Sequence, residues 1–306
     1  MKILIADDDV TSRLVLAGVL RKCGHEVVVT VDGTEAWEAM RQPDAPRLAI
    51  LDWMMPGLAG VDVCRRVRAL ESDQPPYLIV LTSKGEKADI VAGLEAGADD
   101  YLAKPFDPGE LRARVDVGRR MIELQEKLRE ARDALAYEAM HDPLTGALNR
   151  RAFAEALSRE LSGERRHRHG LALGICDVDR FKSINDTHGH QVGDEVLCGL
   201  VGLMERSLRG HDVLGRFGGD DFVVLTGHAG GEAAVAAFER VRAEVADNPI
   251  ATRVGDVSVT ISFGVSTWRE GDTEDELLAA ADTALYRAKA AGRDRVCLAG
   301  PDAIVR

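Results

Sequence analysis

The chain has 306 residues, which is long enough for two domains with separate hydrophobic cores. Its 39 basic and 51 acidic residues give a net charge of −12, and this balance argues against general nucleic-acid binding, which needs a positive field. The cysteines never form a Cys-x-x-Cys pair, no apolar run approaches the roughly 18 residues of a membrane span, and the start shows no signal-peptide pattern. We therefore expect a cytoplasmic protein with reduced thiols that contacts neither membrane nor nucleic acid.

The first hundred residues alternate apolar runs with segments whose apolar residues recur at helical spacing. The expected strands are Ile3–Ala6, Val27–Val29, Leu48–Leu51, Leu78–Leu81 and Tyr101–Ala103, and the expected helices are Ser12–Lys22, Thr34–Arg41, Gly60–Leu70 and Ala88–Ala96. This alternation predicts a doubly wound parallel α/β sheet, and such sheets bind ligands beyond the carboxyl ends of their strands.

Charged and hydroxyl residues stand at the ends of four of the expected strands. They are Asp7 and Asp8 after the first strand, Asp52 after the third, Thr82 at the end of the fourth and Lys104 after the fifth. In a parallel sheet these groups converge on one crevice. The carboxylates would hold Mg²⁺ there, and the metal together with the lysine would neutralise an incoming phosphoryl group.

Residues 1–120 resemble a response-regulator receiver domain, which has a flavodoxin-like fold. The resemblance implies that Asp52, in Leu-Asp-Trp-Met-Met-Pro-Gly, accepts a phosphoryl group from a sensor histidine kinase. The implied Mg²⁺ ligands are the carboxylates of Asp7, Asp8 and Asp52 and the carbonyl of Met54. The implied switch residues are Thr82, Tyr101 and Lys104, the last preceding a candidate cis-proline, Pro105. The alternative is a receiver that no longer accepts phosphate, which usually lacks the aspartate or the lysine.

Residues 107–140 predict a helical stalk that overlaps the last receiver helix. Asp107-Pro108-Gly109-Glu110 is typical of a helix start, and no glycine or proline occurs from Arg119 to Asp142. Apolar residues spaced 4, 3, 4, 3 and 4 form a heptad seam, namely Val117, Met121, Leu124, Leu128, Ala131 and Leu135. We expect a coiled-coil stalk joining a parallel homodimer, and the alternative is an ordinary amphipathic helix lying on its own domain.

Residues 141–306 form the expected second domain, which opens with His141-Asp142-Pro143-Leu144-Thr145-Gly146. Proline and glycine in this segment stop the stalk helix. The expected helices are Arg151–Leu161, Asp194–Leu208, Glu232–Val245 and Glu274–Ala291, and the expected strand regions are Leu171–Asp179, a central hairpin and Val257–Trp268, with a loop that includes Gly189 and Gly193. This β-α-β-β-α-β order is the split arrangement of ferredoxin-like and palm α+β domains.

The central hairpin is predicted from Arg216-Phe217-Gly218-Gly219-Asp220-Asp221-Phe222. Paired glycines accept the positive φ angles of short turns, so the two aspartates would stand at an exposed tip. Their mutual repulsion favours a magnesium ion that carries a nucleotide phosphate, although the turn alone is also compatible with a plain surface hairpin. In the predicted fold the strand ending near Asp177 is a neighbour of the tip, so Asp177 and Asp220 would share the ion.

From about His141 to Val296 the sequence resembles the GGDEF family of diguanylate cyclases, because several separate motifs agree in order and spacing. The family makes cyclic di-GMP and pyrophosphate from two GTP molecules. The resemblance implies Mg²⁺ ligation by Asp177, the Val178 carbonyl and Asp220, with Asp221 next to the reacting 3′-hydroxyl or a second ion. The implied substrate contacts are Phe181, Lys182, Lys289 and Arg293 for the phosphates and Asn185 and Asp194 for the guanine.

Asp221 departs from the family pattern, which usually has glutamate at this position. Aspartate keeps the charge but is one methylene shorter, so metal binding should survive while turnover is in doubt. The alternative function is therefore a catalytically weak domain that binds cyclic di-GMP as an effector. A DNA-binding output is disfavoured because no helix-turn-helix pattern follows the stalk.

Arg209-Gly210-His211-Asp212 precedes the hairpin and matches the family's RxxD product-inhibition site. Arginine stacks on guanine or donates to phosphate, and aspartate accepts from a guanine edge. Arg240 is a further candidate for an inhibitory contact, and an ordinary helix-end ion pair is the alternative for Arg209 and Asp212. The sequence as a whole predicts a phosphorylation-controlled diguanylate cyclase whose dimer geometry is set by the receiver through the stalk.

Overall fold

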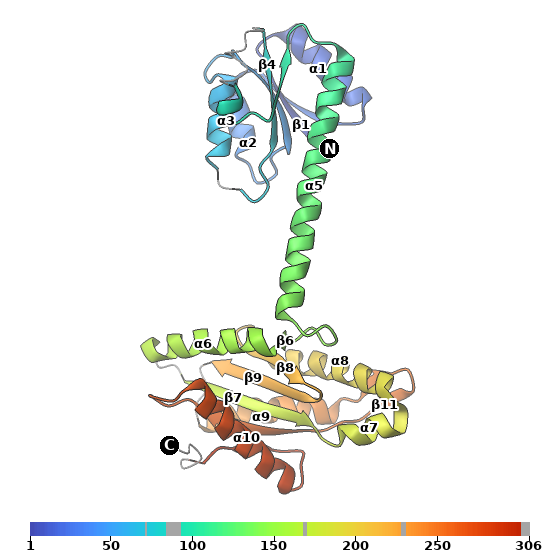
Figure 1. Cartoon of the computed structure of the whole chain (residues 1–306), viewed down its shortest axis with the longest axis vertical. Coiled ribbons are helices and arrows are strands. Elements are labelled where there is room, and N and C mark those ends of the chain that lie inside the picture. The colour runs from blue at the N-terminus through green and yellow to red at the C-terminus, as the bar shows by residue number, and fades with distance from the viewer. Residues whose placement is uncertain (71, 84–92, 168–169, 228–230, 301–306) are drawn as a thin grey trace. The chain divides into compact units, whose positions relative to one another are not determined.

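The computed structural model describes residues 1–70, 72–83, 93–167, 170–227 and 231–300, without the side chains of 164–167. The chain forms two compact units, Met1–Asp133 and Ala134–Arg306 (Figure 1). Across the described residues, no helix has the length and apolar character needed to cross a membrane.

The first unit contains the predicted parallel sheet. Its strands are β1 (Lys2–Ala6), β2 (Glu26–Thr30), β3 (Leu48–Asp52), β4 (Tyr77–Thr82) and β5 (Asp100–Ala103), in the order β2-β1-β3-β4-β5. Figure 1 shows α1 (Val10–Lys22) on the same side of this sheet as the start of α5 (Pro108–Met140), and α2 (Gly33–Met40) with α3 (Gly60–Arg68) on the other. The expected helix Ala88–Ala96 falls mostly on residues 84–92, which lie outside the described residues; residues 93–95 are helical.

Burial on both faces explains why these strands read as continuous apolar runs. Every residue of β3 and β4 is buried, as expected for a parallel sheet covered by helices on two sides. Two hydrophobic clusters fill the two interfaces, one against α1 and α5 and one against α2 and α3. The N-terminus of α1 is capped by Asp9, whose carboxylate accepts a hydrogen bond from the Ser12 backbone N–H at 2.8 Å.

Helix α5 runs unbroken for 33 residues and has two different faces. One face is buried in the first unit through Leu111, Val115, Gly118 and Ile122. The predicted heptad residues lie elsewhere on the helix, and Leu124, Leu128 and Leu135 are 60%, 72% and 65% exposed. We call Val117, Met121, Leu124, Leu128, Ala131 and Leu135 the stalk seam. The alternative in which this seam lies on its own domain is disfavoured by these exposures.

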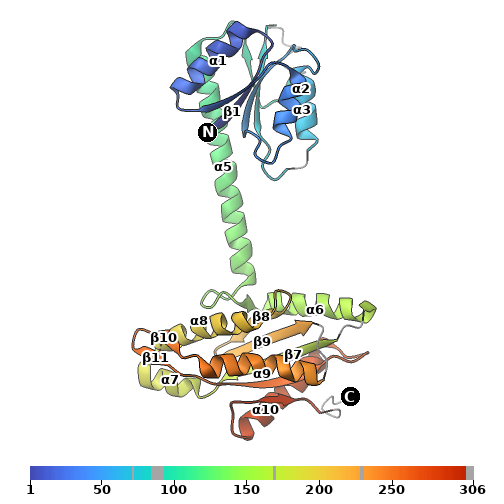
Figure 2. The same cartoon turned by 180° about the vertical axis from the view of Figure 1, so that it is seen from behind.

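The second unit contains a six-stranded sheet in the order β13-β12-β7-β9-β8-β6. Its strands are β6 (Leu148–Asn149), β7 (Leu171–Val178), β8 (Val213–Gly218), β9 (Asp221–Gly227), β12 (Ile261–Thr267) and β13 (Val296–Leu298). The four central strands have the predicted ferredoxin-like order. Helices α6 (Arg150–His167) and α10 (Glu274–Ala290) lie on one face, and α8 (His190–Ser207) and α9 (Glu232–Asp247) lie on the other (Figure 2).

Two expectations for the second unit are wrong in detail. The stretch after Asp179 forms a helix, α7 (Phe181–His188), and α8 begins at His190, so Gly193 is helical and not part of a loop. Gly189, with φ of 85°, separates the two helices. The strand expected at Val257–Trp268 is divided, because β10 (Ile250–Thr252) and β11 (Gly255–Val257) pair as a separate hairpin before β12 begins.

The central hairpin forms as predicted between β8 and β9. Gly218 and Gly219 have φ angles of 144° and 55°, which favour glycine, and the register shifts between Arg216 and Gly218. The turn therefore presents Asp220 at the end of the sheet, directly before β9 begins.

Candidate functional site

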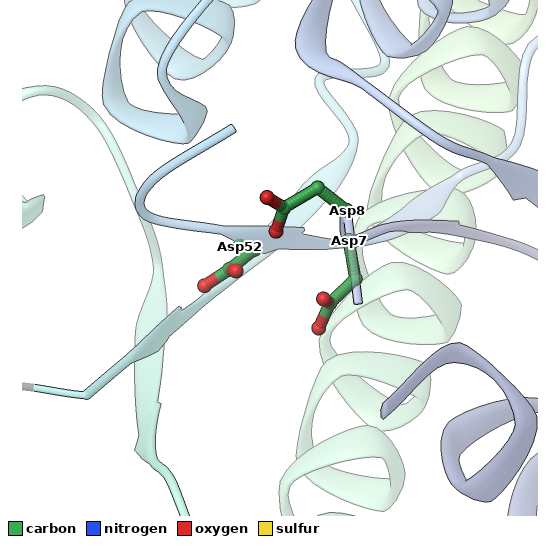
Figure 3. Close-up of side chains that lie close together, drawn as sticks. All are labelled: Asp7, Asp8 and Asp52. Atoms are coloured by element: carbon green, nitrogen blue, oxygen red, sulfur yellow. The ribbon is translucent and has the colours of Figure 1, made fainter. Parts of the chain in front are cut away.

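Three carboxylates meet at the carboxyl end of the receiver sheet. Asp7 and Asp8 follow β1 and Asp52 ends β3, and each offers an oxygen within 4.8 Å of the others (Figure 3). Among the described residues, these three form the one group of at least three Asp, Glu, His or Cys residues whose ligand atoms all lie this close together. The donor set consists of hard oxygen atoms, which suits Mg²⁺.

Lys104 connects two of these carboxylates. Its Nζ lies 2.7 Å from Asp7 Oδ2 and 2.9 Å from Asp52 Oδ2. Burial raises the pKa of Asp52, although the Lys104 hydrogen bond opposes that rise. Burial would lower the pKa of Lys104, but its bonds to both carboxylates outweigh this, and the pKa lies above its usual value. The lysine is therefore held as a cation against the carboxylates.

The other receiver residues lie around this group. Thr82 is buried at the end of β4, and its carbonyl accepts a hydrogen bond from the Lys104 backbone N–H at 2.7 Å. The Tyr101 ring lies under the Arg114 guanidinium of α5, 5.6 Å from centroid to carbon. The bond between Lys104 and Pro105 is cis, as predicted. Sequence reasoning missed Ser12, whose hydroxyl donates to Asp7 Oδ2 at 2.5 Å.

In the second unit, β7 and β9 bring two predicted acidic residues opposite each other. The register of this antiparallel pair places Asp177 across from Asp221. Side chains alternate along a strand, so both point to the face that Leu173 and Val223 share with α6 and α10. Asp220 lies at the adjoining turn.

Lys289 of α10 contacts this acidic group from above the sheet. Its Nζ lies 2.6 Å from Asp177 Oδ2. Burial raises the pKa of Asp177, and repulsion from Asp220 and Asp221 adds to the rise, against the effect of Lys289. Burial likewise raises the pKa of Asp221, with further repulsion from Asp220. Asp177 and Asp221 are thus repelled by neighbouring carboxylates, and a cation between them would relieve the repulsion.

The expected phosphate contacts are distributed around the same end of the sheet. Phe181 and Lys182 open α7, directly after Arg180, which adopts a left-handed φ of 58°. The N–H groups of Phe181 and Lys182 open the helix and have no acceptor one turn earlier within it, whereas the Ser183 N–H donates to the Arg180 carbonyl at 2.8 Å. Arg293 follows α10 in a left-handed conformation with φ of 66°.

Asp179, to which the sequence analysis gave no role, fixes this loop. Its carboxylate accepts hydrogen bonds from the hydroxyls of Thr260 and Ser262, both at 2.7 Å, and from the Asp294 backbone N–H at 3.0 Å. It thereby ties the end of β7 to β12 and to the residue next to Arg293. The sequence shows only an aspartate two positions after Asp177. Its burial and its partners, which are distant in sequence, appear in the structure.

The two residues expected to contact a base lie on α7 and α8. Asn185 has a buried side-chain oxygen without a hydrogen-bond partner, and Gly193 leaves the space beside it, since a Cβ there would lie 1.9 Å from that oxygen. Asp194 is exposed and lines a groove of about 560 Å³. Sequence reasoning missed Leu144 and Cys198, which line the same groove.

The predicted inhibitory residues follow the carboxyl end of α8. Arg209 and Asp212 line a second groove of about 220 Å³, together with His141 and Leu148. The Asp212 carboxylate accepts a hydrogen bond from the Arg209 backbone N–H at 2.8 Å. Arg240 of α9 donates two hydrogen bonds to the Ser207 carbonyl, both at 3.2 Å, so it lies close to this segment.

Comparison with known proteins places both units in families. Residues 139–295 match the model of the diguanylate cyclase GGDEF domain, and residues 3–116 match that of the response regulator receiver domain. Response regulator PleD of Caulobacter vibrioides is 32% identical over 298 residues, which cover 96% of this chain and 65% of PleD. Diguanylate cyclase DgcP of Pseudomonas aeruginosa is 43% identical over 161 residues, 52% of this chain and 24% of DgcP. The chain thus spans less than two thirds of either relative.

A solved structure supports the same assignment for the second unit. The coiled coil and GGDEF domain of DgcB from Caulobacter crescentus, in complex with c-di-GMP, aligns with a TM-score of 0.55 at 29% identity and covers 62% of this chain and 99% of that chain. The order of the strands, the glycine hairpin and the matched residues lead to one conclusion: the chain belongs to the GGDEF diguanylate cyclase domain family and carries a receiver domain before that domain.

Proposed function

We propose that this protein condenses two molecules of GTP into cyclic di-GMP and two of pyrophosphate, under the control of phosphorylation at Asp52. The observation that carries the proposal is the acidic group at the ends of β7 and β9, where Asp177 and Asp221 face each other beside Asp220 and under Lys289. The names of PleD, DgcP and DgcB, and the c-di-GMP bound to DgcB, agree with it.

The reaction joins a ribose 3′-oxygen of one GTP to the α-phosphorus of the other and breaks the bond to pyrophosphate. Mg²⁺ held by Asp177, the Val178 carbonyl and Asp220 would stabilise the charge on the reacting phosphate. Asp221, which lies opposite Asp177, would receive the 3′-hydroxyl proton or bind a second ion. Lys289 would leave Asp177 and turn to the phosphates, where Lys182, Arg293 and the first amides of α7 also bind.

Guanine selectivity follows from Asp194 and Asn185. The N1–H and the exocyclic amine of guanine are donors that a carboxylate accepts, whereas adenine has an acceptor at N1 and no amine at position 2. The unbonded Asn185 oxygen would gain a partner when the base binds. An unpaired buried acceptor costs roughly 1–3 kcal/mol, so ATP would bind poorly.

Replacing Asp177 by asparagine should lower the rate of cyclic di-GMP formation at least about 100-fold, because the change removes a metal-binding charge at constant shape. The measurement is product formation from GTP at saturating Mg²⁺, followed by chromatography. Asp256→Asn, an exposed residue of β11, is the matched control and should stay within about twofold of the parent. An Asp177→Asn protein as active as this control would refute the proposed catalytic site.

The stalk seam supports the proposal that the active form is a parallel homodimer. One active site binds one GTP, so two catalytic domains must meet before a 3′-oxygen reaches the second α-phosphate. The seam residues are apolar, regularly spaced and exposed over several turns of α5. A second copy of the same helix buries such a surface by coiled-coil packing.

Replacing Leu128 by glutamate should weaken the dimer at least about tenfold, because two glutamates would then meet at one layer of the seam. Sedimentation over a range of protein concentrations measures this change, and specific activity should fall in parallel at low concentration. Ala136→Glu adds the same charge off the seam and serves as the control. Equal dimerisation of the two variants would contradict the proposed interface.

The receiver site supports control by a phosphoryl group. Asp52 is nearly buried beside Asp7 and Asp8, and Lys104 already bonds to it, so an added phosphoryl group would meet both Mg²⁺ ligands and a cation. Thr82 and Tyr101 would then move inward and change the surface that includes the start of α5. The phosphodonor would be a sensor histidine kinase.

Beryllofluoride, a mimic of the phosphoryl group, should raise cyclase activity at least about fivefold through differential stabilisation of the active state. Asp52→Asn should abolish this response, because the acceptor oxygen is lost. Asp62→Asn, on α3 with a side chain that is 48% exposed, should respond like the parent protein. If Asp52→Asn and the parent respond alike, receiver control is wrong, whether or not the cyclase is active.

Product inhibition is proposed at the groove that contains Arg209 and Asp212, with Arg240 close by. Arg209→Ala should raise the half-inhibitory concentration of cyclic di-GMP at least about tenfold, because a charge-assisted contact is lost. The rate without added cyclic di-GMP should stay unchanged. Arg206→Ala, one helical turn earlier and paired with Glu244, is the control. Unchanged inhibition in Arg209→Ala would exclude this site.

A further inference from the structure

The first residue of the glycine hairpin motif holds the tip of its own turn. Arg216 Nε and Nη2 donate to the Gly219 carbonyl at 3.0 and 2.7 Å. The remaining terminal nitrogen, Nη1, donates to Asp142 Oδ1 at 2.7 Å. One guanidinium therefore joins the hairpin tip to a residue 74 positions earlier in the chain.

Asp142 is itself firmly placed. It comes two residues after the last residue of α5, and its Oδ1 also accepts from the Thr145 backbone N–H at 2.9 Å and hydroxyl at 2.7 Å. Its own N–H donates to the Ala147 carbonyl at 2.7 Å. Burial would raise the pKa of Asp142, but the bonds from Thr145 and Arg216 outweigh it, so the pKa is lowered. The carboxylate is thus an anionic anchor for Arg216.

The end of the stalk helix is tied to this anchor. The rings of Tyr137 and His141 are stacked, with centroids 3.8 Å apart, and the His141 N–H donates to the Tyr137 carbonyl at 2.9 Å. The Asn149 side chain donates to the Ala139 carbonyl at 2.9 Å. The last turn of α5, His141 and Asp142 therefore form one connected segment.

The hairpin tip has open space beside its two glycines. A Cβ at Gly218 or Gly219 would meet no heavy atom within 4 Å, so no neighbouring group approaches either position from the side where a side chain would lie. Gly219 directly precedes Asp220. The direction of the Gly219 peptide, and with it the start of Asp220, depends on the bonds that its carbonyl accepts.

We propose that Arg216 and Asp142 form a clamp that positions the catalytic hairpin and couples it to the end of the stalk helix. The clamp is well shielded, since the side chains are 11% and 21% exposed, which makes the charge-assisted bonds strong. A change in the direction of the last turn of α5 moves Asp142, then Arg216, and then the Gly219 peptide. Arg216 acts through Asp220 and is a positioning residue. The catalytic part of this inference rests on the proposed cyclase function.

The test uses Arg216→Lys and Asp142→Asn in the full chain. Lysine keeps the charge but cannot bond the carbonyl and the carboxylate with a planar fork. Each variant should lower kcat at least about tenfold with KM for GTP within about twofold, because the clamp positions groups for the transition state and does not bind substrate. The double variant should be no slower than the slower single one, because both changes break one interaction.

Amide hydrogen exchange supplies a readout that does not depend on activity. In Arg216→Lys, exchange should rise at least about tenfold both at residues 217–221 and at residues 142–147, since a coupling acts in both directions. Exchange in β7 and α9 should stay unchanged, which shows that the domain is folded. Arg150→Lys is the matched control, because Arg150 lies over the Phe217 ring of the same strand, 5.4 Å from its centroid.

The outcomes separate the clamp from the cyclase function. Three results would each overturn the clamp. They are a double variant in which the two reductions in kcat multiply, a change in KM alone, and unchanged exchange at residues 217–221. Faster exchange at the hairpin without any change at residues 142–147 would overturn its coupling to the stalk. A parent protein and an Arg150→Lys control that both fail to convert GTP would refute the proposed cyclase and leave the exchange test of the clamp intact.

Discussion

In both units, the candidate site depends on the contact between a lysine and carboxylates that lie close together at the ends of strands. Lys104 bonds to Asp7 and Asp52 in the receiver, and Lys289 bonds to Asp177 beside the glycine hairpin. Burial raises the pKa values of Asp52 and Asp177, neighbouring carboxylates add to the rise, and the bonds from the lysines oppose it. The same crowding is what the proposed divalent ions and phosphates would relieve at each site.

The two folds reach this arrangement by different routes. In the receiver, parallel strands end at one edge of the sheet, so residues at the carboxyl ends of β1, β3 and β5 lie close together. In the second unit β7 and β9 are antiparallel, and their register places Asp177 opposite Asp221, next to the glycine turn between β8 and β9. Asp179 and the Arg216–Asp142 contact then hold the surrounding loops.

Helix α5 has two sets of apolar residues, one buried and one exposed. Leu111, Val115 and Ile122 are buried in the receiver core, whereas Leu124 and Leu128 are exposed. Apolar residues that remain exposed along a helix are the kind of surface that the proposed homodimer would bury. Tyr101, the proposed switch residue, contacts Arg114 of the same helix.

The sequence by itself determined the receiver sheet, the order of the main helices and strands of the second unit, the unbroken helix after Pro108 and the glycine turn. Each of these features follows from local apolar periodicity or from the backbone preferences of single residues, as the φ angles of Gly218 and Gly219 illustrate. It missed α7 and the division before β12, where short polar segments carry little periodicity and packing decides. Only the tertiary structure decided that Lys289 bonds to Asp177, that Asp179 holds the loop beside Arg293, and that Arg216 reaches Asp142. Such contacts join residues far apart in the chain, and side chains of this kind gain a partner only when packing has brought their backbones together.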